Sequence, residues 1–282
     1  MPNPSDFVAT PDDGVAWITG ASSGIGAALA RKLAKEGWRV AVTARSADDL
    51  RAFAEECAGL PGEILVHPGD TTDDARMAQI VADIEADAGA ISLAVLNAGV
   101  YLPVDGTAPD LRAFQKSFDV NLGGTVNCLV PLVEAMRGHG RGQVALVASV
   151  AGYGGLPTSA AYGATKAGMI NLAEALKFDL DRIGVRIQIV SPGFVDTPAT
   201  KDNPFPMPHL MQVEDAASRL HDGLKRRGNF EITFPRRFTW QLKALQLLPY
   251  RWYFALLGRS TGWSKKGPPE ARPRDTVAEA AQ

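Results

Sequence analysis

The amino-acid sequence predicts an α/β protein in which a doubly wound, seven-stranded parallel sheet lies between two layers of helices. Short aliphatic runs recur along the chain, and stretches with helical patterning separate them. The runs are continuously apolar rather than alternating, which is typical of parallel strands that helices cover on both faces. A chain of 282 residues is long enough to bury one large α/β core without a second domain. We therefore expect a three-layer αβα fold.

The expected strands follow in chain order from these runs. They cover residues 14–18, 38–44, 63–68, 91–97, 143–149, 185–191 and 229–234. The main domain is expected over residues 14–235, after a polar, proline-rich lead-in at residues 1–13. Residues 236–263 carry apolar positions at helical spacing and are expected to add amphipathic helices to the same domain. Residues 264–282 have the composition of a disordered tail.

A glycine-rich turn, TGASSGIG, lies between the first expected strand and a helical pattern. Gly20, Gly24 and Gly26 permit a tight turn and let backbone N–H groups approach a pyrophosphate at the start of the helix. Glycines also mark ordinary loops, so the motif alone is weak. The strand before it and the helix after it favour a dinucleotide-binding turn.

Ser149, Tyr162 and Lys166 form a second constellation. Tyr162 and Lys166 are four residues apart, so on a helix they share one face. An isolated phenol has a pKa of about 10, and a lysine cation nearby favours the phenolate. Ser149 ends an expected strand, where its hydroxyl can hold a carbonyl or alcohol oxygen beside that phenol. Together these side chains predict a proton-transfer site.

With these motifs the chain resembles the short-chain dehydrogenases/reductases, over roughly residues 12–235. The family's T-G-x-x-x-G-x-G pattern spans residues 19–26, its N-A-G signature spans residues 97–99, and its P-G motif is residues 192–193. The family's serine and Y-x-x-x-K pair are also present. One departure is Leu96, where many members carry a second asparagine that supports the central strand. The resemblance implies a Rossmann-type fold and an oxidoreductase activity.

The resemblance also implies a mechanism in which hydride passes between a nicotinamide and a carbonyl carbon. Tyr162 would give or take the proton, Ser149 would orient the oxygen, and Lys166 would lower the pKa of the tyrosine and bind the nicotinamide ribose. Asn121 matches the family's active-site asparagine and is expected to anchor a water that connects Lys166 to solvent. Each residue alone also fits a plain structural role, in packing, at a strand end or at a helix cap. The alternative function is a cofactor-binding sensor or scaffold without significant turnover.

The resemblance further assigns the cofactor contacts. Ser22 and Ser23 would add hydroxyl groups to the glycine-rich turn, and residues 192–197 would frame the nicotinamide. Asp70 and Thr71 match the position that holds the adenine ring, although an N-cap for the next helix is the alternative interpretation. The full expected set is Gly20, Ser22, Ser23, Gly24, Ile25, Gly26, Arg45, Asp70, Thr71, Asn97, Ala98, Gly99, Tyr162, Lys166, Pro192, Gly193, Val195 and Thr197.

The end of the second expected strand bears on the choice between NADP(H) and NAD(H). An acidic residue there would bind the ribose 2′-hydroxyl and repel a 2′-phosphate. This chain has Ala44 at the position of that acid and Arg45 next to it, and a guanidinium suits a phosphate dianion. A solvated loop arginine is the plainer interpretation of Arg45. The missing carboxylate favours NADP(H), and therefore reduction as the direction in cells.

The substrate pocket is predicted from position and apolar character alone. Residues 196–213 are expected to form a lid over a hydrophobic ketone or secondary alcohol. An ordinary surface loop is the alternative for this stretch. The candidate contacts are Phe205, Met207, Leu210 and Met211 in the lid, together with Tyr101, Tyr153 and Leu156 beside the catalytic motifs.

Residues 225–266 differ in composition from the rest of the chain, with ten lysines and arginines against one acid, Glu231. They also include Trp240, Trp252 and Trp263. Basic and aromatic residues on short amphipathic helices are typical of a peripheral membrane contact. The favoured alternative is that these helices cover the substrate pocket or a subunit interface, with their charges solvated. Proline and embedded charge exclude a spanning helix here.

The net charge, the cysteines and the histidines exclude some classes of protein. The net charge of −2 offers no general attraction for nucleic acid. Cys57 and Cys128 lie in separate helical segments and favour a reduced, cytoplasmic compartment over a disulfide framework. The four histidines are scattered, so no metal site is expected. The family resemblance implies a homodimer or homotetramer.

Overall fold

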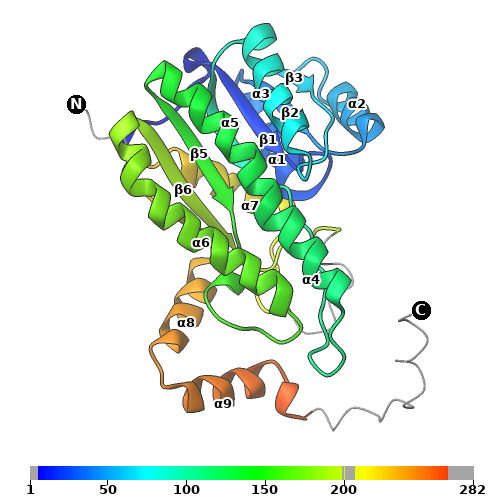
Figure 1. Cartoon of the computed structure of the whole chain (residues 1–282), viewed down its shortest axis with the longest axis vertical. Coiled ribbons are helices and arrows are strands. Elements are labelled where there is room, and N and C mark those ends of the chain that lie inside the picture. Colours follow the sequence, from blue (N-terminus) through cyan, green and yellow to red (C-terminus); the bar gives the residue numbers. More distant parts are fainter. Residues whose placement is uncertain (1–5, 199, 201–206, 266–282) are drawn as a thin grey trace.

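The computed structural model describes residues 6–198, 200 and 207–265 (Figure 1). The seven expected strands form one parallel sheet, which confirms the predicted fold. These strands are β1 (Val15–Thr19), β2 (Arg39–Thr43), β3 (Glu63–Val66), β4 (Ile91–Leu96), β5 (Gly142–Val147), β6 (Val185–Pro192) and β7 (Glu231–Phe234). Their order across the sheet is β3-β2-β1-β4-β5-β6-β7.

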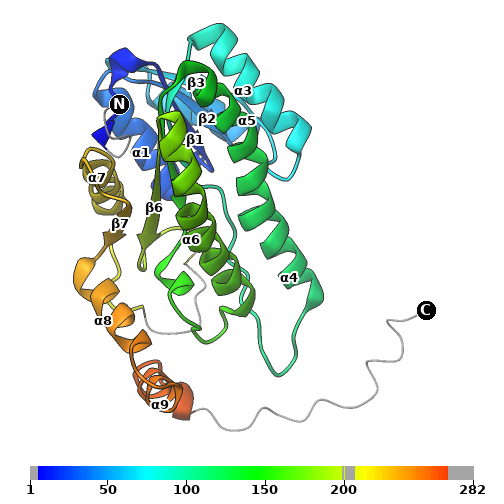
Figure 2. The same cartoon turned by 60° about the vertical axis from the view of Figure 1, so that its left-hand side comes forward.

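Helices cover both faces of this sheet (Figure 2). One layer contains α1 (Gly24–Lys35), α2 (Ala47–Glu56) and α7 (Val213–Leu224), and the other contains α3 (Asp74–Ala88), α5 (Gly124–His139) and α6 (Ala160–Leu180). A short helix, α4 (Leu111–Ser117), runs into α5 through the π-helical turn η3 (Phe118–Gly123). The 3₁₀ turns are η2 (Pro11–Asp13), η4 (Val150–Gly152), η5 (Asp181–Ile183) and η6 (Trp263–Lys265).

The central strand β1 shows why continuous apolar runs form this fold. Ile18 points into the core under α1 and α7, whereas Trp17 points into the opposite core under α3, α5 and α6. Both side chains are fully buried. The indole Nε1 of Trp17 donates to Oγ1 of Thr43 on β2 at 2.9 Å, so its polar atom is satisfied inside the protein. A strand covered on both faces needs apolar residues at successive positions.

The strand order reverses between β1 and β4, and this reversal positions the functional site. From β1 the chain continues outward to β2 and β3, whereas β4 on the other side leads to β5, β6 and β7. The loops after β1 and β4 therefore depart to opposite sides of the sheet. In open parallel sheets, ligands bind in the crevice that this divergence leaves at the carboxyl ends of the strands.

Two further helices follow β7. They are α8 (Arg236–Gln246) and α9 (Tyr250–Ser260), and Pro249 separates them as the N-cap residue of α9. Both views place them beyond the carboxyl ends of the strands, outside the three layers (Figures 1 and 2). The ammonium of Lys243 on α8 pairs with Glu231 on β7, which joins α8 to the edge of the sheet.

At the opposite end of the sheet, where the strands begin, the buried side chain of Arg186 connects neighbouring segments of the chain. Arg186 is the second residue of β6. Its guanidinium donates to the carbonyl oxygens of Phe7 at 2.8 Å and Asn229 at 3.2 Å. It also donates to the carbonyls of Leu224, the last residue of α7, and of Arg226 just beyond it. One side chain therefore holds the chain's start and the α7–β7 loop against β6.

We expect Arg186→Met to lower the free energy of unfolding by about 3 kcal/mol, because it removes the charged donor of the buried hydrogen bonds to the carbonyl oxygens of Phe7, Leu224, Arg226 and Asn229. Arg182→Met is the matched control, since the Arg182 side chain is 80% exposed. Its effect should stay within about 0.5 kcal/mol. Urea unfolding of both variants measures the difference. Equal stabilities would show that the Arg186 contacts contribute little.

Candidate active site

A cavity of about 700 Å³ runs along the carboxyl ends of the strands, at the point where the strand order reverses. It collects nearly all of the residues expected to bind the cofactor. Those lining it are Gly20, Ser22, Ser23, Gly24, Ile25, Arg45, Asp70, Thr71, Asn97, Ala98, Gly99, Tyr162, Lys166, Pro192, Gly193, Val195 and Thr197. Gly26 is the member of the expected set that does not line the cavity.

Close backbone contacts explain the glycine-rich turn. Gly20 has a φ of +64°, and a Cβ there would lie 2.8 Å from the Cα of Ala98. A Cβ on Gly26 would collide with the carbonyl oxygen of Gly20. Gly20 therefore lets the turn lie against the segment after β4, and Gly26 lets α1 lie against the turn. The contribution of Gly26 is close packing rather than ligand contact.

The start of α1 has unsatisfied donors beside the cavity. Ser23 is its N-cap residue, but the Ser23 side chain accepts no capping hydrogen bond. The first N–H groups of a helix have no partner within the helix, and they carry the positive end of its dipole. This helix end can therefore accept a phosphate group at Ser22, Ser23 and Gly24.

The side-chain amide of Asn97, at the cavity wall, binds the glycine-rich turn. Its Nδ2 donates to the carbonyl oxygens of Thr19 at 3.1 Å and Gly20 at 3.0 Å. The backbone N–H groups of Asn97 and Ala98 both donate to Oγ1 of Thr19, at 3.0 and 3.1 Å. The sequence suggested Asn97 as a cofactor contact. In the structure its amide donors are used to hold the end of β4 against the end of β1.

Ser149, Tyr162 and Lys166 meet on one wall of the cavity. Ser149 follows β5 and is the N-cap residue of η4, where its Oγ accepts from the N–H of Ala151 at 3.1 Å. Tyr162 and Lys166 lie in the first turns of α6, and Nζ of Lys166 is 5.5 Å from the centroid of the Tyr162 ring. The ring of Tyr101 packs edge-on against Tyr162, with 5.2 Å between centroids.

The ionisation of this group differs from the sequence-based expectation. Burial raises the pKa of Tyr162, and the hydrogen bond with Ser149 acts in the opposite direction. Burial also lowers the pKa of Lys166 to about 7, so the lysine is only partly charged near neutral pH. Its Nζ donates to the carbonyl oxygen of Val147 at 2.8 Å. Desolvation of the two side chains therefore outweighs the stabilisation of the phenolate expected from a lysine cation.

Asn121 lies behind the cavity wall in η3 and is fully buried. Its carboxamide accepts from the N–H of Val100 at 2.7 Å and donates to the carbonyl of Val100 at 2.9 Å and to Oγ1 of Thr165 at 3.2 Å. A Cβ on Gly99 would lie 3.2 Å from the Asn121 oxygen and 3.5 Å from Nζ of Lys166. The carboxamide thus ties the segment after β4 to α6, close to the lysine.

The far end of the cavity is lined by Arg45, which is exposed, and by Asp70. The Asp70 carboxylate accepts from the N–H of Thr72 at 3.0 Å and from its hydroxyl at 2.9 Å. These bonds, together with the positive charges of Lys116 and Arg45, hold the pKa of Asp70 below its usual range. The alternative in which Asp70 caps the next helix is wrong, because Asp73 is the N-cap of α3.

Lining residues at this end that sequence reasoning missed include Ser46 and Asp49. Ser46 is the N-cap residue of α2 and Asp49 lies in its first turn, and Oγ of Ser46 accepts from the N–H of Asp49 at 3.2 Å. The sequence signal was a serine three residues before an acidic residue, which is an N-cap pattern. It indicated that α2 begins at the cavity.

The substrate candidates divide between the cavity and other sites. Tyr101 and Leu156 line the cavity. Met207 and Leu210 do not, and Leu210 is exposed. Phe205 and most of the predicted lid centre, residues 199 and 201–206, lie outside the described residues. Lining residues that were not predicted include the apolar Val120 and Val150.

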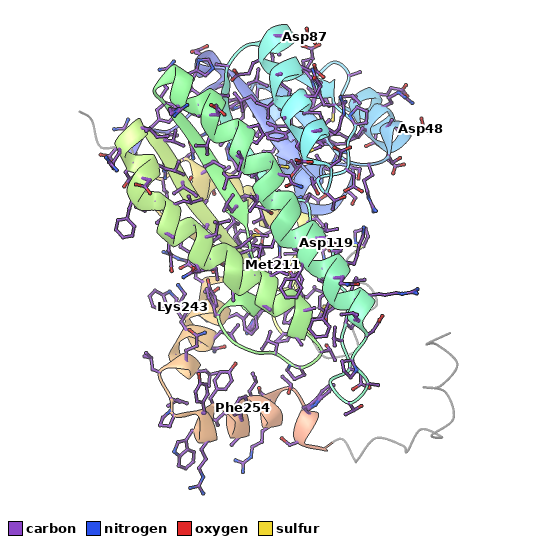
Figure 3. The ribbon with its side chains drawn as sticks, viewed as in Figure 1. Asp48, Asp87, Asp119, Met211, Lys243 and Phe254 are labelled. Carbon is purple, nitrogen blue, oxygen red and sulfur yellow. The ribbon has the colours of Figure 1, made fainter. Side chains whose placement is uncertain are left out.

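Two of the candidates need correction. Tyr153 points to the sheet edge, because its hydroxyl donates to Glu231 and the Lys243 ammonium lies 4.9 Å from its ring centroid. Met211 is buried in the core under α7, since its backbone forms a bridge with Val195 (Figure 3). Neither side chain lines the cavity.

Comparisons with known proteins agree with this geometry. The protein family described as short chain dehydrogenase matches residues 14–205. An uncharacterized oxidoreductase of Myxococcus xanthus is 35% identical over 83% of this chain and 92% of its own length. A cis-4-hydroxycyclohexanecarboxylate dehydrogenase of Sinomonas cyclohexanicum is 34% identical, over 73% of this chain and 83% of that protein.

A solved structure extends the likeness to three dimensions. An actinorhodin polyketide ketoreductase variant with NADPH superimposes with a TM-score of 0.72 at 26% sequence identity. The match covers 80% of this chain and 97% of that one.

The low pKa of Lys166 predicts that stability depends on pH. Its ordinary pKa is 10.5, but the folded protein releases the proton near pH 7. Between these values the unfolded chain binds more protons, so the free energy of unfolding should rise by about 1 kcal/mol per pH unit from about pH 7.5 to 9. Lys166→Met removes the ionisable group, so the free energy of unfolding of this variant should not show the same rise over this pH range. Denaturant unfolding of both proteins without cofactor measures it, and parallel pH profiles would contradict the low pKa.

Proposed function

The chain belongs to the short-chain dehydrogenase/reductase family, and from this membership we propose that it is an NADP(H)-dependent oxidoreductase acting on a hydrophobic ketone or secondary alcohol. The observation that carries the proposal is the shared cavity. A glycine-rich turn and an uncapped helix start lie at one part of it, and Ser149, Tyr162 and Lys166 lie on another wall. A nucleotide bound to the turn would therefore lie in the same cavity as the proton-transfer group.

The residues present fit a nicotinamide dinucleotide. The missing Cβ of Gly20 and the free N–H groups at the start of α1 suit a pyrophosphate. When bound, the cofactor supplies or accepts the hydride. For reduction, the Tyr162 hydroxyl donates its proton to the substrate oxygen while Ser149 holds that oxygen by a hydrogen bond. Lys166 then returns a proton toward Tyr162, which its pKa of about 7 allows near neutral pH.

The environment of Arg45 supports NADP(H) over NAD(H). Ala44, at the end of β2, offers no carboxylate to a ribose 2′-hydroxyl, and Arg45 lines the cavity with an exposed guanidinium. A guanidinium can bind a phosphate through two parallel hydrogen bonds. Asp49 and Asp70 line the same end, and their carboxylates would oppose a 2′-phosphate there.

The substrate class follows from the lining near Tyr162. Tyr101, Val150, Leu156 and Phe194 offer mainly apolar surface there, which suits a hydrophobic carbonyl better than a sugar. The dehydrogenase from Sinomonas cyclohexanicum is named for a cyclic secondary alcohol, which agrees with chemistry of this class. Reduction is the direction that an NADPH pool favours.

We expect Tyr162→Phe to lower kcat by about 10²- to 10⁴-fold, because the phenylalanine ring has no proton to transfer. Cofactor affinity should stay within about threefold. The change in kcat is measured as NADPH consumption with a series of ketones that range from small to steroid-like. Cofactor affinity is measured by titration of cofactor fluorescence.

Tyr101→Phe is the matched control, since it removes a hydroxyl in the same cavity that is 3.1 Å from Oγ1 of Thr158. It should retain most of the activity. Full activity in Tyr162→Phe would remove Tyr162 as the proton donor. Tight NADPH binding without turnover on any ketone by the unaltered protein would favour a sensor instead.

A second experiment addresses cofactor choice. Arg45→Ala should weaken NADPH binding by about tenfold or more, which is the loss expected for a charge-assisted hydrogen bond, and leave NADH binding within about twofold. Asp49→Asn, one turn away on the same cavity edge, should strengthen NADPH binding slightly. Equal losses for both cofactors in Arg45→Ala would show that Arg45 does not bind the 2′-phosphate.

A further inference from the structure

Helices α8 and α9 expose an unusual density of large apolar side chains. Within this segment Trp240 is 66% exposed, Trp252 is 59% exposed and Phe254 is 63% exposed. Leu247, Tyr250 and Leu256 are exposed as well. We call these six side chains, with the arginines described next, the α8–α9 surface. A water-soluble helix pair would normally bury such residues or replace them with polar ones.

The charge on this surface has a single sign. Residues 236–265 contain no aspartate or glutamate. Arg236, Arg237, Arg251 and Arg259 are exposed, and none pairs with an acidic side chain in the part of the chain that the structure describes. Lys243 is the exception, because it points inward to Glu231. The surface is therefore positively charged as well as aromatic.

The attachment of α9 orients this surface away from the protein. Tyr253 and Leu257, one turn apart, are the buried residues of α9. At 100° per residue, Arg251 and Arg259 lie on the opposite side of the helix. Phe254 lies at the outer end of the molecule, far from the sheet (Figure 3). The basic groups thus point outward, and aromatic side chains flank them.

The two helices are also joined to the cavity wall. The hydroxyl of Tyr253 donates to the carbonyl of Gly155 at 3.0 Å, and the next residue, Leu156, lines the cavity. On α8, the ring of Phe238 lies 5.7 Å from the ring of Phe194, another lining residue. The α8–α9 surface therefore extends from the apolar end of the cavity.

We propose that the α8–α9 surface binds an anionic lipid bilayer, with the helices lying in the interface and the apolar end of the cavity directed toward it. Tryptophan and phenylalanine rings enter the headgroup region, and arginines on the same helix bind lipid phosphates. No helix among the described residues is long and apolar enough to cross a membrane. This inference concerns the surface alone and does not depend on the cofactor or the reaction.

The charge distribution favours a bilayer over a second copy of the chain. In a two-fold contact the same patch meets itself. The exposed arginines of one copy would then face those of the other, with no acidic side chain from residues 236–265 to pair with them. An anionic lipid surface supplies the missing negative charge and accepts the aromatic rings at the same time.

The test is sedimentation of the full chain with lipid vesicles. Binding to phosphatidylcholine vesicles that contain phosphatidylserine should exceed binding to phosphatidylcholine alone by about tenfold or more. Two double variants address the two parts of the surface. Arg251→Glu with Arg259→Glu should abolish the preference for the anionic vesicles, and Trp252→Ser with Phe254→Ser should reduce binding to them by about tenfold or more.

Matched controls lie elsewhere on the surface. Phe178 is 78% exposed on α6, and the Arg182 side chain is 80% exposed on η5. Phe178→Ser and Arg182→Glu should bind vesicles like the unaltered protein. Equal binding to both kinds of vesicle would overturn the proposal, as would undiminished binding of the Trp252/Phe254 variant. Loss of a dimer in that variant, with no vesicle binding by the unaltered protein, would assign the surface to a second copy instead.

Discussion

The contact between the glycine-rich turn and the end of β4 is the constraint on which the site depends. It closes only because Gly20 has no Cβ and because the Asn97 amide donates to the carbonyls of Thr19 and Gly20. These bonds fix β1 and β4 at the reversal of strand order. The start of α1 is thereby placed on one side of the cavity, and the segment leading to Asn121 on the other.

The cavity wall that carries Tyr162 and Lys166 is built at some cost to stability. Lys166 is almost completely buried and Tyr162 is desolvated, so each charged form is disfavoured in the folded protein. Their arrangement persists because the rest of the sheet is densely packed around Trp17 and Ile18. Burial brings the pKa of Lys166 to about 7, whereas it moves the pKa of Tyr162 further above neutral. Of the two side chains, Lys166 is therefore the one that titrates near neutral pH.

Sequence reasoning was sufficient for the fold, because continuous apolar runs report burial on both faces of a strand directly. The family resemblance added most of the residues along the cavity, whereas the glycine-rich turn and the Tyr162–Lys166 pair could also be selected from their local spacing. Sequence reasoning failed where the direction of a side chain depends on a residue far away in the sequence. Tyr153 turns away from the cavity because Glu231, far along the chain, accepts its hydroxyl, and Met211 is buried because its backbone pairs with Val195. No local pattern encodes either contact.

The buried guanidinium of Arg186 lies at the amino ends of the strands, whereas every residue of the cavity lies at their carboxyl ends. The residues that stabilise the fold through Arg186 therefore lie at one end of the sheet, and the residues that line the cavity lie at the other. Loops around the cavity can change length or side chains during evolution without disturbing the junction that secures Phe7 and Asn229. The same separation suits engineering, because a pocket can be redesigned at one edge while the other is left to preserve the scaffold.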